Sequence, residues 1–267
     1  MGLKLRIPNS DYSSVDLNNP IYDIDTDANN YIINSGIYDP TVKYAIKKLI
    51  KDLKDNFIWD SISAFWLFAG NFADACKLDV KGNPDYTLQN LKNTHLNNGL
   101  MLNYVNIDTP KYIDTGFRGT SALLNSGHLS AYNSLESSGN KIILHDVGGS
   151  GALSGYHLTR SISTGIMSGG IKGTWSGSNI PQNLEKGLIA ITQLNTLVKI
   201  YSKGILQGDI VKTNVTGEPL NNLTISTPST YNSSVKLQFV SVGIGLDDNK
   251  QLLLSNIVQN YVTLLGR

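Results

Sequence analysis

The sequence of this chain is poor in cysteine and in charged residues. Cys76 is the single cysteine among 267 residues, so an intramolecular disulfide is excluded. A lone cysteine of this kind is expected to be a small buried apolar residue. Charged residues make up 16% of the chain and the net charge is +1. This balance provides no electrostatic field that would attract nucleic acid or an anionic membrane.

Long apolar runs are also missing. No stretch approaches the roughly 20 apolar residues that a membrane-spanning helix needs. Residues 1–14 lack the apolar segment of a secretion signal, so we expect synthesis in a cytoplasm without export by the usual route. The fingerprints of dinucleotide-binding, phosphate-loop and nucleophile-elbow enzymes are absent as well, and we predict no cofactor.

Paired acidic residues of the kind that a glycoside hydrolase places on either side of the scissile bond are not evident. The three glutamates, Glu136, Glu185 and Glu218, lie far apart in loop-like contexts. Asp108 and Asp114 do not fit one face of a short strand. We therefore predict that the chain is not an enzyme, and a glycoside hydrolase is the least favoured of its functions.

The residues that the chain contains in abundance are Asn, Ser, Thr, Gly and Tyr, a composition typical of many short strands joined by polar turns. Period-two patterns separated by turn signals recur at a spacing typical of a sandwich or barrel. The predicted strands are 64–68, 100–106, 112–117, 128–133, 141–146, 156–162, 188–194, 197–201, 205–211 and 235–242.

Glycine marks two features between these strands. Lys203-Gly204 predicts a tight hairpin turn, because glycine tolerates positive φ. The Gly- and Ser-rich stretches 146–157 and 168–179 are interpreted either as long surface loops or as a strand edge that carries glycines.

A helix is predicted over about residues 39–56. Asp39 is an acidic N-cap, and Pro40 follows at the first helical position, where its missing N–H has no cost. Apolar residues then recur at helical spacing and form one stripe, which consists of Val42, Ile46, Leu49 and Leu53.

A second helix is predicted over about residues 248–265. It follows a strand and a glycine-containing turn, and Asp247 or Asp248 can cap it. Gly266 provides the stop. Its apolar stripe consists of Leu253, Ile257, Tyr261 and Leu264.

Residues 1–37 differ from the rest of the chain. They are polar, rich in Asn and Asp, and have no sustained hydrophobic period. Such a segment cannot offset its own ordering entropy, so we interpret it as an extended N-terminal docking arm. It either wraps its own domain or lies on a neighbouring subunit. Residues 38–267 form the second, folded unit in this division.

Several stretches resemble one family of phage proteins. They are DPTVKYAIKKLIKDLKDNFIWDSISAFWLFAG, THLNNG, YIDTGF, LNSGHLSAYN, VKIYSKGIL and, at the end, VSVGIGLDD followed by NIVQNYVTLLGR. In this order and spacing they resemble a phage virion module with a concanavalin A-like (laminin G-like) fold, of the kind found in crAss-like and other Bacteroidetes phages. The resemblance covers roughly residues 38–267.

The resemblance implies a single all-β domain, a concanavalin A-like antiparallel β-sandwich or jelly roll flanked by the two helices. It also implies a virion structural protein, namely an auxiliary capsid (decoration) protein or head-fibre component attached through the N-terminal arm. The partners would then be capsid or fibre subunits, and the location the virion. The alternative is a receptor-binding or glycan-binding adhesin module on a tail or fibre, with a bacterial surface glycan as its partner.

Three aromatic residues are candidates for a glycan site, because sandwich proteins hold sugars by stacking them on aromatic rings. They are Trp175, Tyr132 and Tyr156. Trp175 stands out because it lies among Gly and Ser in a loop-like stretch. Each of the three also suits ordinary packing within a sheet.

Asp23, Asp25 and Asp27 alternate in the sequence and are weak candidates for a cation site. In an extended segment their carboxylates would project from one face. The EF-hand pattern fails, because Ala28 and Asn34 occupy the positions that require Gly and Glu. The histidines do not have the spacing of metal ligands, so we predict no metal.

Overall fold

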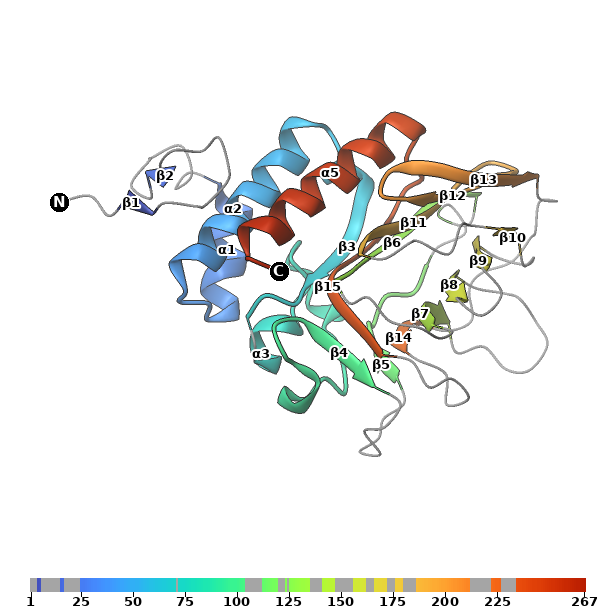
Figure 1. The fold of residues 1–267 in the computed structure, drawn as a ribbon. Coiled ribbons are helices and arrows are strands. Elements are labelled where there is room, and N and C mark those ends of the chain that lie inside the picture. The colour runs from blue at the N-terminus through green and yellow to red at the C-terminus, as the bar shows by residue number, and fades with distance from the viewer. Residues whose placement is uncertain are drawn as a thin grey trace.

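The computed structural model describes residues 4–5, 15–16, 25–70, 72–103, 112–119, 123, 125–134, 141–146, 156–161, 166–171, 176–179, 186–211, 222–226 and 234–267. Two antiparallel sheets lie face to face, and helices cover the outer face of one of them (Figure 1). This architecture confirms the predicted all-β, jelly-roll type sandwich with flanking helices. In the described part of the chain, no helix is long and apolar enough to cross a membrane.

The larger sheet has seven strands in the order β13-β12-β11-β6-β15-β3, with β4 paired to the first half of β15. Its central strands are buried on both faces, because one face packs against the second sheet and the other against the helices. The strands are β3 (Ile62–Leu67), β4 (Leu100–Asn103), β6 (Ser126–Asn133), β11 (Gly187–Leu194), β12 (Leu197–Ser202), β13 (Ile205–Val211) and β15 (Ser234–Gly243).

The smaller sheet has six strands in the order β10-β9-β8-β7-β14-β5. The strands are β5 (Tyr112–Asp114), β7 (Lys141–Asp146), β8 (Tyr156–Ser161), β9 (Ile166–Ile171), β10 (Ser176–Asn179) and β14 (Leu223–Ser226). Two further short strands, β1 (Lys4–Leu5) and β2 (Val15–Asp16), pair with each other near the N-terminus.

Apolar side chains from both sheets fill the space between them. Trp66, Leu129, Leu144 and Ile225 are fully buried there, and Cys76 joins them as expected. The Trp66 indole donates a 2.8 Å hydrogen bond to the carbonyl of Tyr86, so its polar edge is satisfied inside the core.

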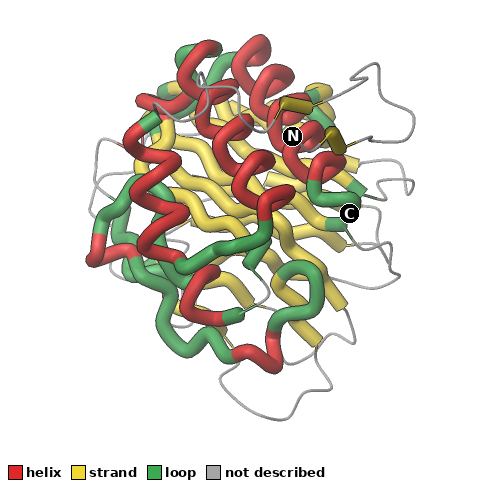
Figure 2. Tube along the Cα trace, turned by 90° about the vertical axis from the view of Figure 1, so that its left-hand side faces the viewer, coloured by secondary structure: helices red, strands yellow, loops and turns green. Residues whose placement is uncertain are grey.

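The helices α1 (Thr26–Ser35), α2 (Pro40–Asp55) and α5 (Asp248–Leu264) form the third layer. Figures 1 and 2 together show helices lying across the strands of the larger sheet, with α1 beside α2 on the outer side of this layer. Phe65 and Phe239 point from the sheet into this layer, with ring centroids 5.8 Å apart, and are buried with the helix residues Ile46 and Val258. The third layer therefore closes the face of the larger sheet that points away from the sandwich core.

Both predicted helices are present, and one residue of the predicted apolar stripe of α5 is exposed. α2 begins after Asp39 and buries Ile46, Leu49 and Leu53 as the pattern indicated. In α5 the buried stripe contains Leu254 in place of Leu253, which is 37% exposed. Ile257 and Tyr261 of the predicted stripe are buried, so the prediction for α5 is wrong only at Leu253 among these three positions.

Helix α1 corrects the expectation that residues 1–37 form an extended arm. Asp25 caps this helix through a 3.0 Å hydrogen bond from the Ala28 amide, and Gly36 ends it at φ 62°. Tyr31 and Ile32 are buried against the rest of the helix layer. Residues 26–35 therefore belong to the folded domain, because this short amphipathic segment gains its order from packing on its neighbours.

The Gly- and Ser-rich stretches contain strands that periodicity did not reveal. β9 and β10 form a hairpin at one edge of the smaller sheet, which agrees with the second interpretation of residues 168–179. β14 lies between β7 and β5 and was missed as well. The predicted turn at Lys203-Gly204 is confirmed, with φ angles of 51° and 77°.

Candidate functional site

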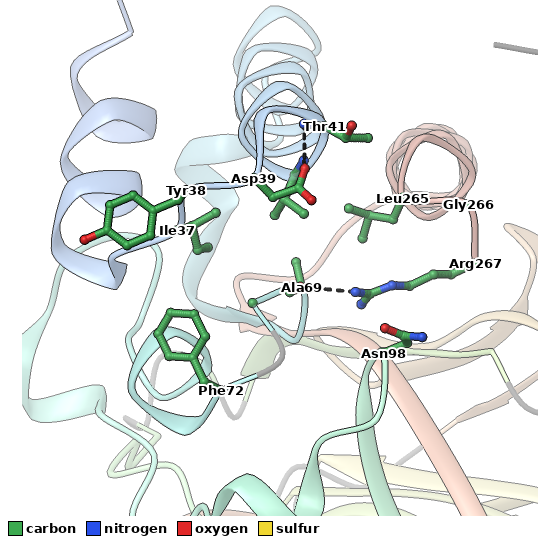
Figure 3. A pocket seen from close by; sticks show the side chains of 12 residues that line it. Ile37, Tyr38, Asp39, Thr41, Ala69, Phe72, Asn98, Leu265, Gly266 and Arg267 are labelled. Carbon is green, nitrogen blue, oxygen red and sulfur yellow. Dashed lines mark hydrogen bonds between the residues drawn. The ribbon is translucent and has the colours of Figure 1, made fainter. Parts of the chain in front are cut away.

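A cavity of about 530 Å³ lies where the start of α2 meets the end of α5. Its walls come from the linker 37–39, the first turn of α2, the loop after β3, the turn before β4 and the end of α5. Four separate segments of the sequence, 37–42, 69–72, 98 and 265–267, thus meet around one space, which we call the α2 cavity (Figure 3).

Two exposed aromatic side chains border the α2 cavity. Tyr38 is 84% exposed and Phe72 is 38% exposed. Figure 3 shows both rings along one wall. The ammonium group of Lys43 lies 5.9 Å from the centroid of the Tyr38 ring, within the range of a cation–π contact. Solvated aromatic rings beside a cavity are surfaces that a ligand can cover with a gain in hydrophobic free energy.

Asp39 holds the neighbouring wall in place as the N-cap of α2. Its Oδ1 accepts hydrogen bonds from the amides of Thr41 at 2.7 Å and Val42 at 3.1 Å. Pro40 fixes φ at the first helical position, so the direction of the chain entering α2 is rigid. The backbone that carries Tyr38 is therefore attached to a well-capped helix.

Arg267 forms the opposite side of the cavity. Its Nη1 donates to the carbonyl of Phe68 and to Oε1 of Gln238, both at 2.9 Å, and its Nη2 donates to the carbonyl of Ala69 at 3.1 Å. Gln238 in turn donates to the carbonyl of Asn98 at 2.7 Å. The guanidinium is thus clamped between the end of β3 and β15.

The charge of Arg267 is partly shielded from water. Burial lowers the pKa of its guanidinium, and Asp39 is one of the groups whose charge opposes that shift. Arginine stays protonated at any physiological pH, so the cavity contains a permanent positive charge. With aromatic faces on one side and a cation, an amide and a hydroxyl elsewhere, the cavity can hold a polar ring by stacking and hydrogen bonding.

Of the predicted glycan-site residues, Tyr132 is corrected by the structure. Its side chain is 2% exposed and lies beneath α5, where its hydroxyl donates a 2.8 Å hydrogen bond to Gln259. A ring in this position offers no face to a sugar. The backbone of Tyr156 begins β8, but its side chain lies outside the described residues, as does the whole of Trp175.

Two of the acidic residues predicted as cation ligands, Asp25 and Asp27, form ion pairs with a lysine instead. Lys54 Nζ lies 2.9 Å from a carboxylate oxygen of Asp25 and 2.6 Å from one of Asp27, so one ammonium group forms ion pairs with both carboxylates. Asp23 lies outside the described residues. Throughout the residues that the structure describes, no three His, Cys, Asp or Glu side chains converge as metal ligands would.

A second cavity of about 520 Å³ lies between α1 and residues 78–87. Its most unusual group is Asp79, whose carboxylate accepts hydrogen bonds from the amides of Phe65 at 3.0 Å and Asn83 at 3.2 Å. Burial raises the pKa of Asp79 to about 6. Since both of its oxygens bind backbone amides, Asp79 fastens the 79–83 turn to β3.

The acidic residues considered as a catalytic pair of a glycoside hydrolase do not form such a pair in the described part of the chain. Asp114 accepts from the amide of Gly116 at 2.8 Å and from Asn222 at 3.3 Å, contacts that stabilise the end of β5. Glu136, Glu185, Glu218 and Asp108 lie outside the described residues.

Comparison with known proteins shows the fold. The binding domain of botulinum neurotoxin DC, solved in complex with SialylT, superposes with a TM-score of 0.54 at 15% identity, over 74% of this chain and 51% of that domain. The binding domain of botulinum neurotoxin serotype D gives a TM-score of 0.52 at 13% identity, over 74% and 52%. The chain shares the β-sandwich fold of these domains.

A mutant of Trypanosoma rangeli sialidase that displays trans-sialidase activity matches with a TM-score of 0.50 at 12% identity, over 82% of this chain and 39% of that enzyme. No family model and no curated protein matches the sequence. The chain spans about half of the neurotoxin binding domains and less of the sialidase. At these identities the similarity concerns the fold and assigns neither activity nor ligand.

Sequence reasoning missed the residues of the α2 cavity. Tyr38 carries one local signal, since it directly precedes the Asp39-Pro40 helix start and is therefore held next to a fixed helix end. Phe72 and Arg267 carry none, because 195 positions separate them in the sequence and only the fold brings them to one cavity.

Proposed function

We propose that this chain is a glycan-binding module that holds a sugar in the α2 cavity. The observation that carries the proposal is the pair of exposed rings, Tyr38 and Phe72, beside a cavity of about 530 Å³ that also presents charged and polar side chains. Sugars combine apolar C–H faces with a rim of hydroxyl groups, so they suit a site that offers both kinds of partner.

The comparisons support a binding role in general terms. Two of the similar structures are named as binding domains of toxins, and one of them was solved with SialylT. Since the same fold serves many functions, the α2 cavity itself has to carry the argument. The expectation of an adhesin thus receives more support than that of an inert coat protein, for which these comparisons offer none.

A glycan array followed by calorimetric titration of the best sugar tests the proposal. We expect saturable binding, and we expect Tyr38→Ala and Phe72→Ala each to weaken it about tenfold, since loss of a stacking ring costs on the order of 1.4 kcal/mol. Neither change should unfold the protein, because both rings contact solvent in the folded state.

Phe57→Ala is the matched control. Phe57 is 78% exposed and follows the far end of α2, about 24 Å along the helix from Asp39. Removing this ring should leave sugar affinity unchanged. Absence of binding to every glycan, or equal loss in the Phe57 variant, would refute a site in the α2 cavity.

The place of the module on a phage particle is a further proposal, supported by the sequence resemblance alone. In this view the protein is a component of the virion, and residues preceding α1 attach it to capsid or fibre subunits. Mass spectrometry of purified particles made with and without residues 1–24 tests it, and equal incorporation of both forms would argue against attachment through this segment.

A further inference from the structure

The guanidinium of Arg267 has binding capacity that the described part of the chain does not use. An arginine side chain has five N–H groups. Its hydrogen bonds to Phe68, Ala69 and Gln238 use three of them. Two donors thus remain for a ligand in the cavity that Arg267 lines.

The existing partners of Arg267 are neutral. Two are backbone carbonyls and the third is the amide oxygen of Gln238, whereas no Asp or Glu side chain among the described residues lies within ion-pair distance of the guanidinium. A half-buried cation without a paired anion binds an incoming carboxylate more strongly than an exposed one does, because water screens it less.

We infer that the α2 cavity selects a sugar that carries a carboxylate, and that the two remaining N–H groups of Arg267 bind this carboxylate. This inference rests on the proposed glycan-binding function. It names the class of sugar, an acidic sugar such as a uronic or sialic acid, with its ring against Tyr38 or Phe72 and its acid group toward Arg267.

The other charged groups near the cavity are compatible with binding of an acidic sugar. Asp39 has the acidic side chain among the described lining residues, but it is exposed to solvent and its Oδ1 already accepts two amide hydrogen bonds. Lys43, next to the Tyr38 ring, adds a second positive charge. Since water screens the exposed Asp39 more than the partly buried Arg267, the field at the guanidinium remains favourable for an anion.

The position of Arg267 is also fixed before a ligand arrives. Its three hydrogen bonds hold the guanidinium against the end of β3 and against β15, so little side-chain entropy is lost on binding. Figure 3 shows the side chain extended across the cavity toward Ala69, with Asn98 beside it. A carboxylate meets a planar donor pair of fixed orientation, the arrangement that favours bidentate binding.

Matched ligand pairs test the inference on the unaltered protein. Calorimetry would compare 3′-sialyllactose with lactose, and trigalacturonic acid with its methyl ester. We expect the acidic member of at least one pair to bind about 10- to 100-fold more tightly, the range for hydrogen bonds to a charged group. Raising the salt concentration should reduce this preference.

Variants then assign the preference to Arg267. Arg267→Gln should abolish the preference, so that the acidic and neutral members of each pair bind with equal affinity, whereas Arg267→Lys should retain part of the preference because the charge remains without the planar fork. Lys250→Gln is the control for loss of one positive charge, since Lys250 lies near the opposite end of α5, about 21 Å from Leu264.

The outcomes separate the two proposals. If neutral sugars bind as tightly as their acidic partners, the acidic preference is overturned while the glycan-binding function stands. If no sugar of either kind binds, both fail. If Arg267→Gln does not fold, the comparison of each acid with its neutral partner on the unaltered protein still tests the acidic preference, and Arg267→Lys tests its assignment to Arg267.

Discussion

Lowering the pH from 7.5 to 5.0 should weaken the folded state through His128. This residue of β6 is fully buried in the larger sheet. Its Nδ1 donates a 2.7 Å hydrogen bond to the carbonyl of Ile244, so in the neutral ring Nε2 is the acceptor and lies 3.2 Å from the Ser241 hydroxyl. Burial lowers the pKa of His128 to about 4, against the opposing effect of the bond to Ile244.

The sign and size of the effect follow from this shift. Because the pKa is lower in the folded than in the unfolded state, His128 contributes stability above its ordinary pKa of 6.5, and that contribution is lost as the pH falls toward 4. With these two values the loss between pH 7.5 and pH 5.0 is about 2 kcal/mol.

Urea denaturation of the protein and of His128→Gln at both pH values measures this loss. Glutamine does not titrate, so the difference in free energy of unfolding between the two proteins should change by about 2 kcal/mol from pH 7.5 to pH 5.0. The difference at a single pH also contains the hydrogen bonds lost in the variant, and only its change with pH reports the proton. A constant difference would show that His128 does not have a lowered pKa.

Two further predictions concern stability. Asp79 has a pH effect opposite in sign to that of His128. Because burial raises the pKa of Asp79 to about 6, its contribution to the free energy of unfolding rises by about 1.4 kcal/mol from pH 7.5 to pH 5.0, and Asp79→Asn should lose this gain in the same urea experiment. If the gain in stability at pH 5.0 persists in the variant, the group that takes up the proton is not Asp79. Gly243→Ala should destabilise the protein by about 1–3 kcal/mol in thermal or urea unfolding, because a Cβ at this position would lie 2.1 Å from the backbone oxygen of Ser61, and unchanged stability would show that β3 and β15 can move apart.

The sequence alone determined the type of fold and both long flanking helices. Each rests on a local signal: Asp39-Pro40 starts α2, Lys203-Gly204 makes a hairpin, and period-two patterns mark the strands that have one polar and one apolar neighbourhood. These signals act between residues a few positions apart. These elements can therefore be predicted from the sequence without knowledge of the tertiary contacts.

The sequence did not predict the elements that are stabilised mainly by contacts with residues distant in the chain. Strands β9 and β10 are rich in Gly and Ser and owe their conformation to pairing at the edge of the sheet. Helix α1 has a weak apolar pattern and is held by burial of Tyr31 and by the pairing of Asp25 with Lys54. Tyr132 was misjudged because its side of β6 became an interior face only when α5 covered it.

The candidate site was decided by tertiary structure. Composition gave a net charge of only +1, and the pattern of strands indicated a sandwich that could bind a ligand. Which residues meet depends on how α2 and α5 pack side by side on the larger sheet, since this packing brings Tyr38, Phe72 and Arg267 to one cavity. Hydrophobic burial drives that packing without regard to sequence distance, so no local pattern records its result.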